Sequence, residues 1–241
     1  MEILIIRHGE PNYAIDSLTD KGWQEAEYLA RRIAPLDVKD YYCSPLGRAH
    51  DTAKATLELA HRSAETLEWL KEFDPQIYRP DRPERKGCVW DWKPSDWTTY
   101  EPFYDEQKWY THPLLEGANT KERYDWVTSN FDALLEKHGY KREGKYYRVI
   151  DRNHDRIVFF CHFGLECVLL SHLIGCSPMV LWHGFVAAPT SVTTIHTEER
   201  DEGIASFRIS SFGDISHLYA NKEEPSFAAR YIECYGDKPG F

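Results

Sequence analysis

Three short polar segments of the chain carry side chains suited to holding a phosphate group. They are Arg7-His8-Gly9-Glu10, the stretch from Ser44 to Arg48, and His162-Phe163-Gly164. Arginine presents a planar fork of N–H donors that matches phosphate oxygens, and it stays charged at any working pH. If the three segments converge, their two arginines and two histidines predict a pocket for a tetrahedral phosphate.

Each of these segments follows a predicted buried strand. The apolar runs at residues 3–6, 40–43 and 157–161 are short, which is typical of strands buried on both faces. Ligands of open α/β sheets bind at the carboxyl ends of parallel strands, so the three segments are expected to meet there. Arg48 lies in the first turn of a predicted helix and His162 just before another, where the positive dipole end favours an anion.

Helices are predicted between the strands because apolar residues recur at spacings of three and four. Thr19 is expected to cap the first helix, and Ser44 to cap the second, with Pro45 in its first turn. This alternation indicates an α/β protein, a three-layer α/β/α sandwich with a mostly parallel central sheet. The helices are expected at about 20–34, 45–61, 124–138 and 165–174, and a hairpin at 191–196 and 205–210.

The composition is that of a folded, acidic protein. The 241 residues are 42% hydrophobic and carry a net charge of −10, and we expect one domain over residues 1–241. The acidic balance argues against nucleic acid as a partner. No apolar run approaches the roughly 20 residues that span a membrane, so no membrane association is expected. The N-terminus lacks the pattern of a secretory signal, and the six cysteines form no CxxC pair, which together predict a cytoplasmic protein with reduced thiols.

The segment of about residues 75–147 differs in composition from the rest of the chain. We interpret it as an insertion, or lid, beside the predicted pocket. It holds five of the eight tryptophans and 12 Lys+Arg against 13 Asp+Glu. This segment lacks the positive charge that a highly phosphorylated substrate favours. Its aromatic side chains have three interpretations: a small satellite core, apolar walls for the leaving group of a phosphoester, or a homodimer contact.

The chain resembles the histidine phosphatase superfamily, in the branch that includes the cofactor-dependent phosphoglycerate mutases. The resemblance covers nearly the whole chain apart from residues 75–147. It implies a phosphatase that acts on a small phosphorylated substrate and needs neither a metal nor another cofactor. It rests on five segments in the order of the family: 7–10, 18–26, 44–53, 158–164 and 213–218.

The resemblance also implies a role for each candidate site residue. His8 would attack phosphorus and form a phosphohistidine, while Arg7, Arg48 and His162 would hold the phosphoryl oxygens. A protonated His162 would serve this purpose best. The family places an acid in a short Leu-x-Glu context, and Glu72 fits that position best, with Glu68 second.

Two departures from related branches favour a phosphatase over a mutase. The mutases continue after the first motif with a Ser and then Trp-Asn, whereas this chain reads Pro11-Asn12-Tyr13-Ala14. The phytase branch has an Asp after its second histidine, and this chain has Phe163 there. The alternatives are a mutase-type phosphotransferase and a phosphate-binding regulatory protein without turnover.

Two His-Asp pairs, His50-Asp51 and His154-Asp155, invite comparison with metal-dependent phosphohydrolases. Those enzymes need a further distant His and Asp on helices. His50 belongs to the predicted helix that already supplies Arg48, and His154 lies in a charged loop. No metal site is therefore expected.

Overall fold

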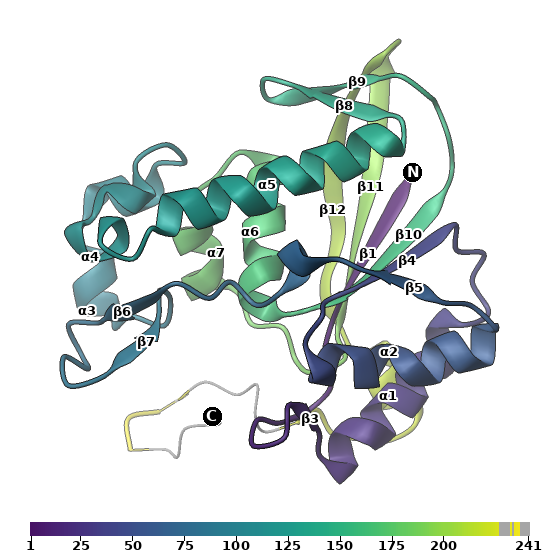
Figure 1. The fold of residues 1–241 in the computed structure, drawn as a ribbon, viewed down its shortest axis with the longest axis horizontal. Coiled ribbons are helices and arrows are strands. Elements are labelled where there is room, and N and C mark those ends of the chain that lie inside the picture. Colours follow the sequence, from purple (N-terminus) through teal and green to yellow (C-terminus); the bar gives the residue numbers. More distant parts are fainter. Residues whose placement is uncertain (227–231, 233, 237–241) are drawn as a thin grey trace.

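One eight-stranded sheet forms the centre of the computed structural model, which describes residues 1–226, 232 and 234–236 (Figure 1). Pairing is parallel from β5 to β1 and antiparallel from β1 to β8. The predicted α/β fold is confirmed, with the parallel strands gathered in one half of the sheet. Across the sheet the order is β5 (Ala64–Thr66), β4 (Asp40–Cys43), β10 (Arg156–Cys161), β1 (Glu2–Arg7), β11 (Val192–Asp201), β12 (Ile204–Asp214), β9 (Tyr146–Val149) and β8 (Tyr140–Glu143).

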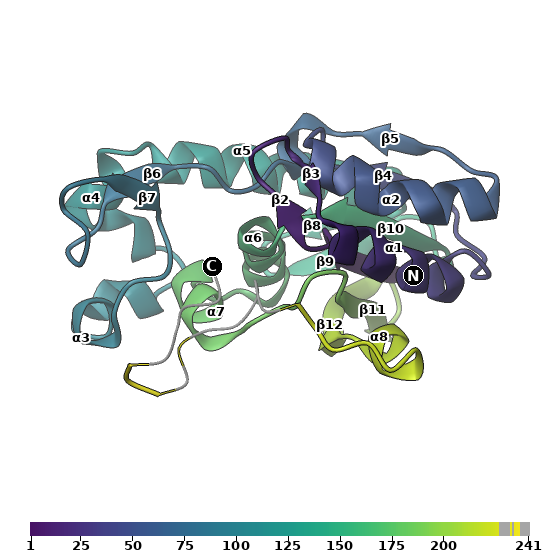
Figure 2. The same ribbon diagram turned by 90° about the horizontal axis from the view of Figure 1, so that it is seen from below.

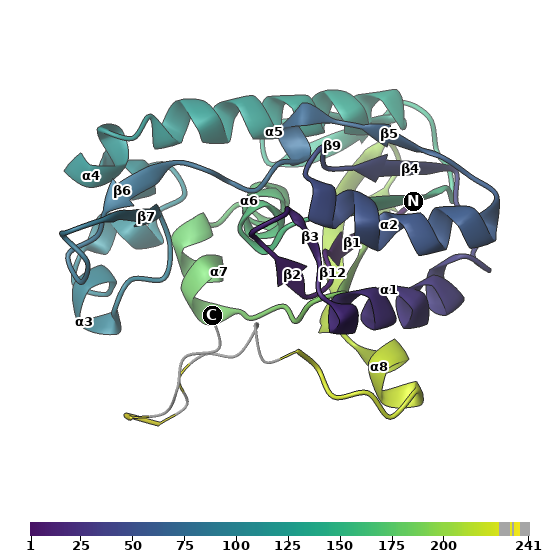
Figure 3. The ribbon, with the colours of Figure 1, turned by 60° about the horizontal axis from the view of Figure 1, so that its bottom comes forward.

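Helices cover both faces of the sheet, as Figure 3 shows. Successive side chains of a strand point to opposite faces. In β1, Leu4 and Ile6 pack in a cluster with α1 (Asp20–Ile33) and α2 (Gly47–Ala60). The alternate residues Ile3 and Ile5 join a second cluster. That cluster also includes side chains of α5 (Thr120–Lys137), α6 (Phe163–Ile174) and α7 (Pro178–Gly184).

The start of α2 differs from its prediction. Thr19 caps α1 as expected, because its side chain accepts a hydrogen bond from the Gly22 N–H at 3.1 Å. In contrast, α2 begins at Gly47, and its N-cap residue Leu46 makes no side-chain capping bond. The hydroxyl of Ser44 is instead turned toward His162.

The part of the predicted insertion before α5 lies to one side of the sheet (Figure 2). Trp92, Phe103 and Trp109 are buried, and they belong to the same hydrophobic cluster as α5 and α6. The helix at α5 was predicted, whereas the β8–β9 hairpin that extends the sheet was not. Within the described residues no helix is long and apolar enough to cross a membrane. The short element η1 (Glu68–Leu70) precedes the predicted insertion. The insertion itself comprises α5, β8, the start of β9 and, before them, β6 (Gln76–Tyr78), β7 (Lys86–Cys88), α3 (Pro94–Trp97), η2 (Glu101–Tyr104), η3 (Trp109–Thr111) and α4 (Pro113–Glu116).

Candidate active site

The three polar segments follow β1, β4 and β10, which are neighbours in the parallel half of the sheet. Backbone pairing continues past the ends of these strands. The His8 N–H donates to the Cys161 carbonyl at 3.0 Å, and the Ser44 N–H donates to the Phe160 carbonyl at 2.9 Å. The residues that follow the strands are therefore held at one edge of the sheet.

His8 is buried, with 2% of its surface exposed, and among the described residues only its Nδ1 has a hydrogen-bond partner. Nδ1 lies 2.8 Å from the carbonyl oxygen of Gly9, which can only accept, so Nδ1 carries the proton. The lone pair of the neutral ring is then on Nε2. Burial, Arg7 and Arg48 lower the pKa of His8 well below its ordinary value of 6.5. A neutral imidazole with a free Nε2 is the form that can attack an electrophile.

His162 lies beside His8, with the two ring centroids 5.2 Å apart. Its Nε2 is 2.7 Å from the hydroxyl of Ser44. Burial, followed by the charges of His8 and two arginines, lowers the pKa of His162 well below 6.5. His162 is therefore neutral in the free protein, which differs from the sequence-based expectation of a protonated ring. Its Nδ1 is buried and has no partner among the described residues.

The two arginines both lie near the pair of histidines. Arg7 donates from Nη1 to the Ala187 carbonyl, and Arg48 donates from Nη1 to Asp16 Oδ1 at 2.6 Å. The second oxygen of Asp16 accepts the N–H of Gly47 at 2.7 Å. Both guanidinium groups act on the pKa values of His8 and His162. Positive charge thus surrounds the pair of histidines, as a phosphate requires.

Glu72 lies beside this group of residues. Its Oε1 accepts the N–H of Phe73 and the N–H of Leu165, each at 2.9 Å. Burial raises the pKa of Glu72 above its ordinary 4.5. The alternative acid, Glu68, has a side chain that is 65% exposed and forms an ion pair with Lys71.

Three residues that lie near the candidate site were not predicted from the sequence to be part of it. They are Asp16, which holds Arg48; Ser44, which was assigned to a helix cap; and Trp90 of the insertion. A β-carbon at Gly164 would overlap the tip of the Trp90 ring and would lie 2.7 Å from Glu72 Oε1. The only sequence signal for these residues was their proximity to the motifs or their place in the aromatic insertion.

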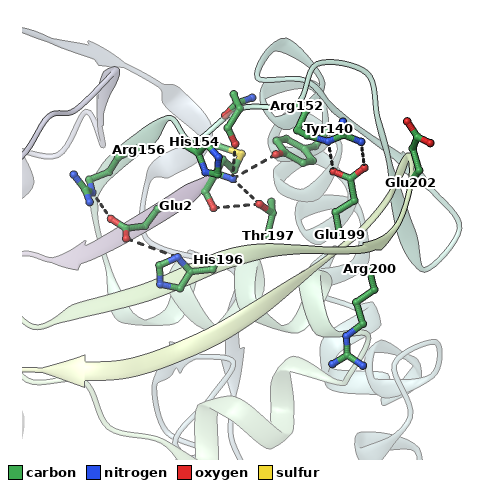
Figure 4. Close-up of a pocket in the computed structure, with 12 residues that line it drawn as sticks. Glu2, Tyr140, Arg152, His154, Arg156, His196, Thr197, Glu199, Arg200 and Glu202 are labelled. Carbon is green, nitrogen blue, oxygen red and sulfur yellow. Dashed lines mark hydrogen bonds and ion pairs between the residues drawn. The ribbon is translucent and has the colours of Figure 1, made fainter.

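A polar cavity of about 660 Å³ lies at the start of β1, the end opposite to the candidate active site (Figure 4). Its charged side chains largely pair with one another, as Arg152 does with Glu199 and Arg156 with Glu2. His154 of the second His-Asp pair lines this cavity and is remote from His8 in the fold. Among the residues that the structure describes, no three His, Cys, Asp or Glu side chains are grouped as metal ligands.

The family of the chain follows from a comparison with family models. Residues 3–210 match the model of the histidine phosphatase superfamily, branch 1. The chain belongs to this superfamily, as the sequence motifs predicted.

Relatives of the chain include both phosphatases and a mutase by name. A probable phosphatase of Schizosaccharomyces pombe is 25% identical over 90% of this chain and 95% of its own length. A 2,3-bisphosphoglycerate-dependent phosphoglycerate mutase of Thermoplasma acidophilum is 32% identical over 80 residues, which are 29% of this chain and 40% of the mutase.

Solved structures of similar fold include phosphoserine phosphatase of Entamoeba histolytica in complex with 3-phosphoglyceric acid. It has a TM-score of 0.59 and 19% identity over 90% of this chain and 98% of its own. A mycobacterial glucosyl-3-phosphoglycerate phosphatase has a TM-score of 0.54 and 16% identity over 88% of this chain and 98% of its own. At these identities the likeness concerns the fold alone.

Proposed function

We propose that this histidine phosphatase hydrolyses a small organic phosphomonoester through a phosphohistidine on His8, without a metal ion. The observation that carries the proposal is the state of His8. Its Nδ1 proton is held by the Gly9 carbonyl, and its lowered pKa keeps Nε2 unprotonated beside two arginines. This combination supplies a nucleophile next to the charges that stabilise a phosphoryl group.

In the first step the Nε2 lone pair of His8 attacks phosphorus while the bond from phosphorus to the alcohol oxygen breaks. Arg7, Arg48 and the Nδ1–H of His162 hold the phosphoryl oxygens. The departing oxygen needs a proton, and Glu72 supplies it, because its raised pKa favours the protonated acid. Both backbone N–H groups reach Oε1, which leaves Oε2 to carry this proton.

In the second step water attacks the phosphohistidine. The Glu72 carboxylate takes a proton from the water as the new P–O bond forms. The P–N bond breaks, its electrons return to Nε2 of His8, and inorganic phosphate leaves. Glu72 is again protonated, so the site is ready for another turnover.

The fate of a ³²P label from a phosphomonoester tests this function. We expect the label in free phosphate and, after a rapid quench, on the protein in an acid-labile, alkali-stable form. His8→Ala should lose roughly a thousandfold or more of the turnover, while circular dichroism shows an intact fold. Label on a second organic molecule would identify a mutase. Phosphate binding without turnover would identify a regulatory protein.

A further inference from the structure

A cavity of about 660 Å³ lies between the insertion and α7. A volume of this size is typical of sites that bind organic ligands. The chemistry proposed for His8 and Glu72 does not use it. Five ring-bearing side chains line it: Trp92, Trp97, Trp182, His183 and Phe185.

One residue of the cavity lining, Trp182, contacts residues beside the candidate active site. Trp182 donates from Nε1 to the carbonyl of Gly164 at 2.9 Å, two residues after His162. Trp182 also packs on Trp90, with ring centroids 5.5 Å apart. The tip of Trp90 lies at Gly164 beside Glu72 Oε1. A continuous pair of indole rings therefore connects the cavity wall to the proposed acid.

A second connection runs through the loop after α7. Phe185 and Val186 line the cavity. The next residue, Ala187, accepts the hydrogen bond from Nη1 of Arg7. One peptide unit thus separates the cavity wall from a group that is proposed to hold the phosphate. The cavity therefore lies beside a residue that is proposed to hold the phosphate.

Charged side chains of both signs line the cavity. Among the described residues, the charged ones that line it are two acids, Asp81 and Asp91, and two bases, Arg82 and Lys93. Arg82 lies 3.6 Å from Asp81, so its charge is already paired. Asp81 and Asp91 also pair with Arg79, which leaves Lys93 as a lining cation without an ion pair among the described residues.

His183 adds a flat surface and no charge. Its Nδ1 is 2.7 Å from the Met179 carbonyl, and its Nε2 accepts the N–H of Trp92 at 3.0 Å. Both nitrogens are used, so the ring is neutral. Trp97 stacks on it with centroids 4.7 Å apart. Flat aromatic surfaces of this kind favour an aromatic ligand.

We infer that this cavity binds the alcohol portion of the phosphomonoester, and that this portion carries a flat aromatic body. The inference rests on the proposed function and names its substrate class.

Two synthetic esters test the inference: 2-(1-naphthyl)ethyl phosphate and propyl phosphate. Both release a primary alkyl alcohol, so their chemical reactivity is closely matched and their difference reports on binding. We expect kcat/KM of the naphthyl ester to exceed that of propyl phosphate by roughly tenfold or more. Trp97→Ala and, on another wall, Phe185→Ala should each reduce this ratio severalfold. Trp126→Ala is the matched control, because Trp126 is exposed on α5 and does not line the cavity.

The outcomes separate the two proposals. Hydrolysis of both esters with equal kcat/KM would overturn the inference and leave the proposed function standing. Faster hydrolysis of phosphoserine than of the naphthyl ester would have the same consequence. If wild-type protein hydrolyses neither ester nor phosphoserine, the proposed function is wrong, and the inference is wrong with it. A ratio that falls in Trp97→Ala and Phe185→Ala but not in Trp126→Ala supports the inference.

Discussion

The hydroxyl of Ser44 lies 2.7 Å from Nε2 of His162 and joins the ends of two neighbouring strands, β4 and β10. Because the lowered pKa of His162 keeps the ring neutral, the Ser44 hydroxyl can donate to Nε2. The ring proton then belongs on Nδ1, which is buried and has no partner among the described residues. Ser44 thus selects the His162 nitrogen that can donate to a phosphate.

Ser44→Ala should therefore lower kcat by roughly ten- to a hundredfold. The variant removes the donor to Nε2, so that His162 no longer favours the Nδ1–H tautomer. The ¹⁵N NMR shifts of the His162 ring should change in the same variant, which a loss of packing alone would not produce. Ser129→Ala, at an exposed position of α5, is the control. An unchanged tautomer in Ser44→Ala would contradict this role.

Glu72→Gln should affect esters according to their leaving group. A glutamine cannot donate the proton that an alkoxide needs, whereas 4-nitrophenolate leaves without one. We expect roughly a hundredfold loss of kcat with an alkyl phosphate and a loss of less than about fivefold with 4-nitrophenyl phosphate. Glu68→Gln should leave both rates unchanged, because Glu68 is on the surface. Equal losses with the two esters would exclude Glu72 as the acid.

The pH profile of kcat/KM should report the ionisation of His8 and of Glu72. The pKa of His8 is lowered, so protonation of the nucleophile reduces the rate only well below pH 6.5. The pKa of Glu72 is raised above 4.5, so the rate falls on the alkaline side as the acid loses its proton. The alkaline limb should be absent in Glu72→Gln. A profile that keeps this limb in the variant would assign it to another group.

Asp16→Ala should weaken phosphate binding, because Asp16 fixes both the Arg48 side chain and the first N–H of α2. We expect an increase in KM of roughly tenfold with a smaller change in kcat. Asp16→Asn should recover part of the loss, since an amide oxygen can still accept a hydrogen bond from Arg48. Asp37→Ala, an exposed substitution, is the control. A KM that stays at the wild-type value in Asp16→Ala would contradict the role.

The buried carboxyl of Glu166 should make stability depend on pH. Burial raises the pKa of Glu166 to about 7, and one of its oxygens has no partner among the described residues. The folded state therefore holds this proton more tightly than the unfolded state. Its contribution to stability is complete below about pH 4.5 and is lost as the pH rises through 7.

Urea unfolding at pH 5 and pH 8 measures this effect. Between these values the free energy of unfolding of the wild type should fall by about 2 kcal/mol relative to Glu166→Gln, which has no proton to lose. Glu58→Gln is the control, because Glu58 is exposed on α2. Parallel pH dependences of the wild type and Glu166→Gln would show that Glu166 is ionised in both states.

The sequence by itself determined which strands end at the site and which arginine and histidine residues follow them. Short apolar runs predict β1, β4 and β10 because such strands are buried on both faces. Arg7, His8 and His162 come directly after two of these runs. Their position follows from where each strand ends, and the pattern of apolar residues indicates that point. The start of α1 was equally predictable, since a helix cap is a contact between near neighbours in the chain.

Where a side chain had more than one possible hydrogen-bond partner, only the tertiary structure decided which partner it binds. The Ser44 hydroxyl could cap a helix or bond across the sheet, and its partner His162 is 118 residues away. Glu68 and Glu72 share one short segment, and the N–H of Leu165 on α6 bonds to Glu72, which supports Glu72 as the proposed acid. Such long-range hydrogen bonds and burial arise when distant elements pack, so no local pattern in the chain records them.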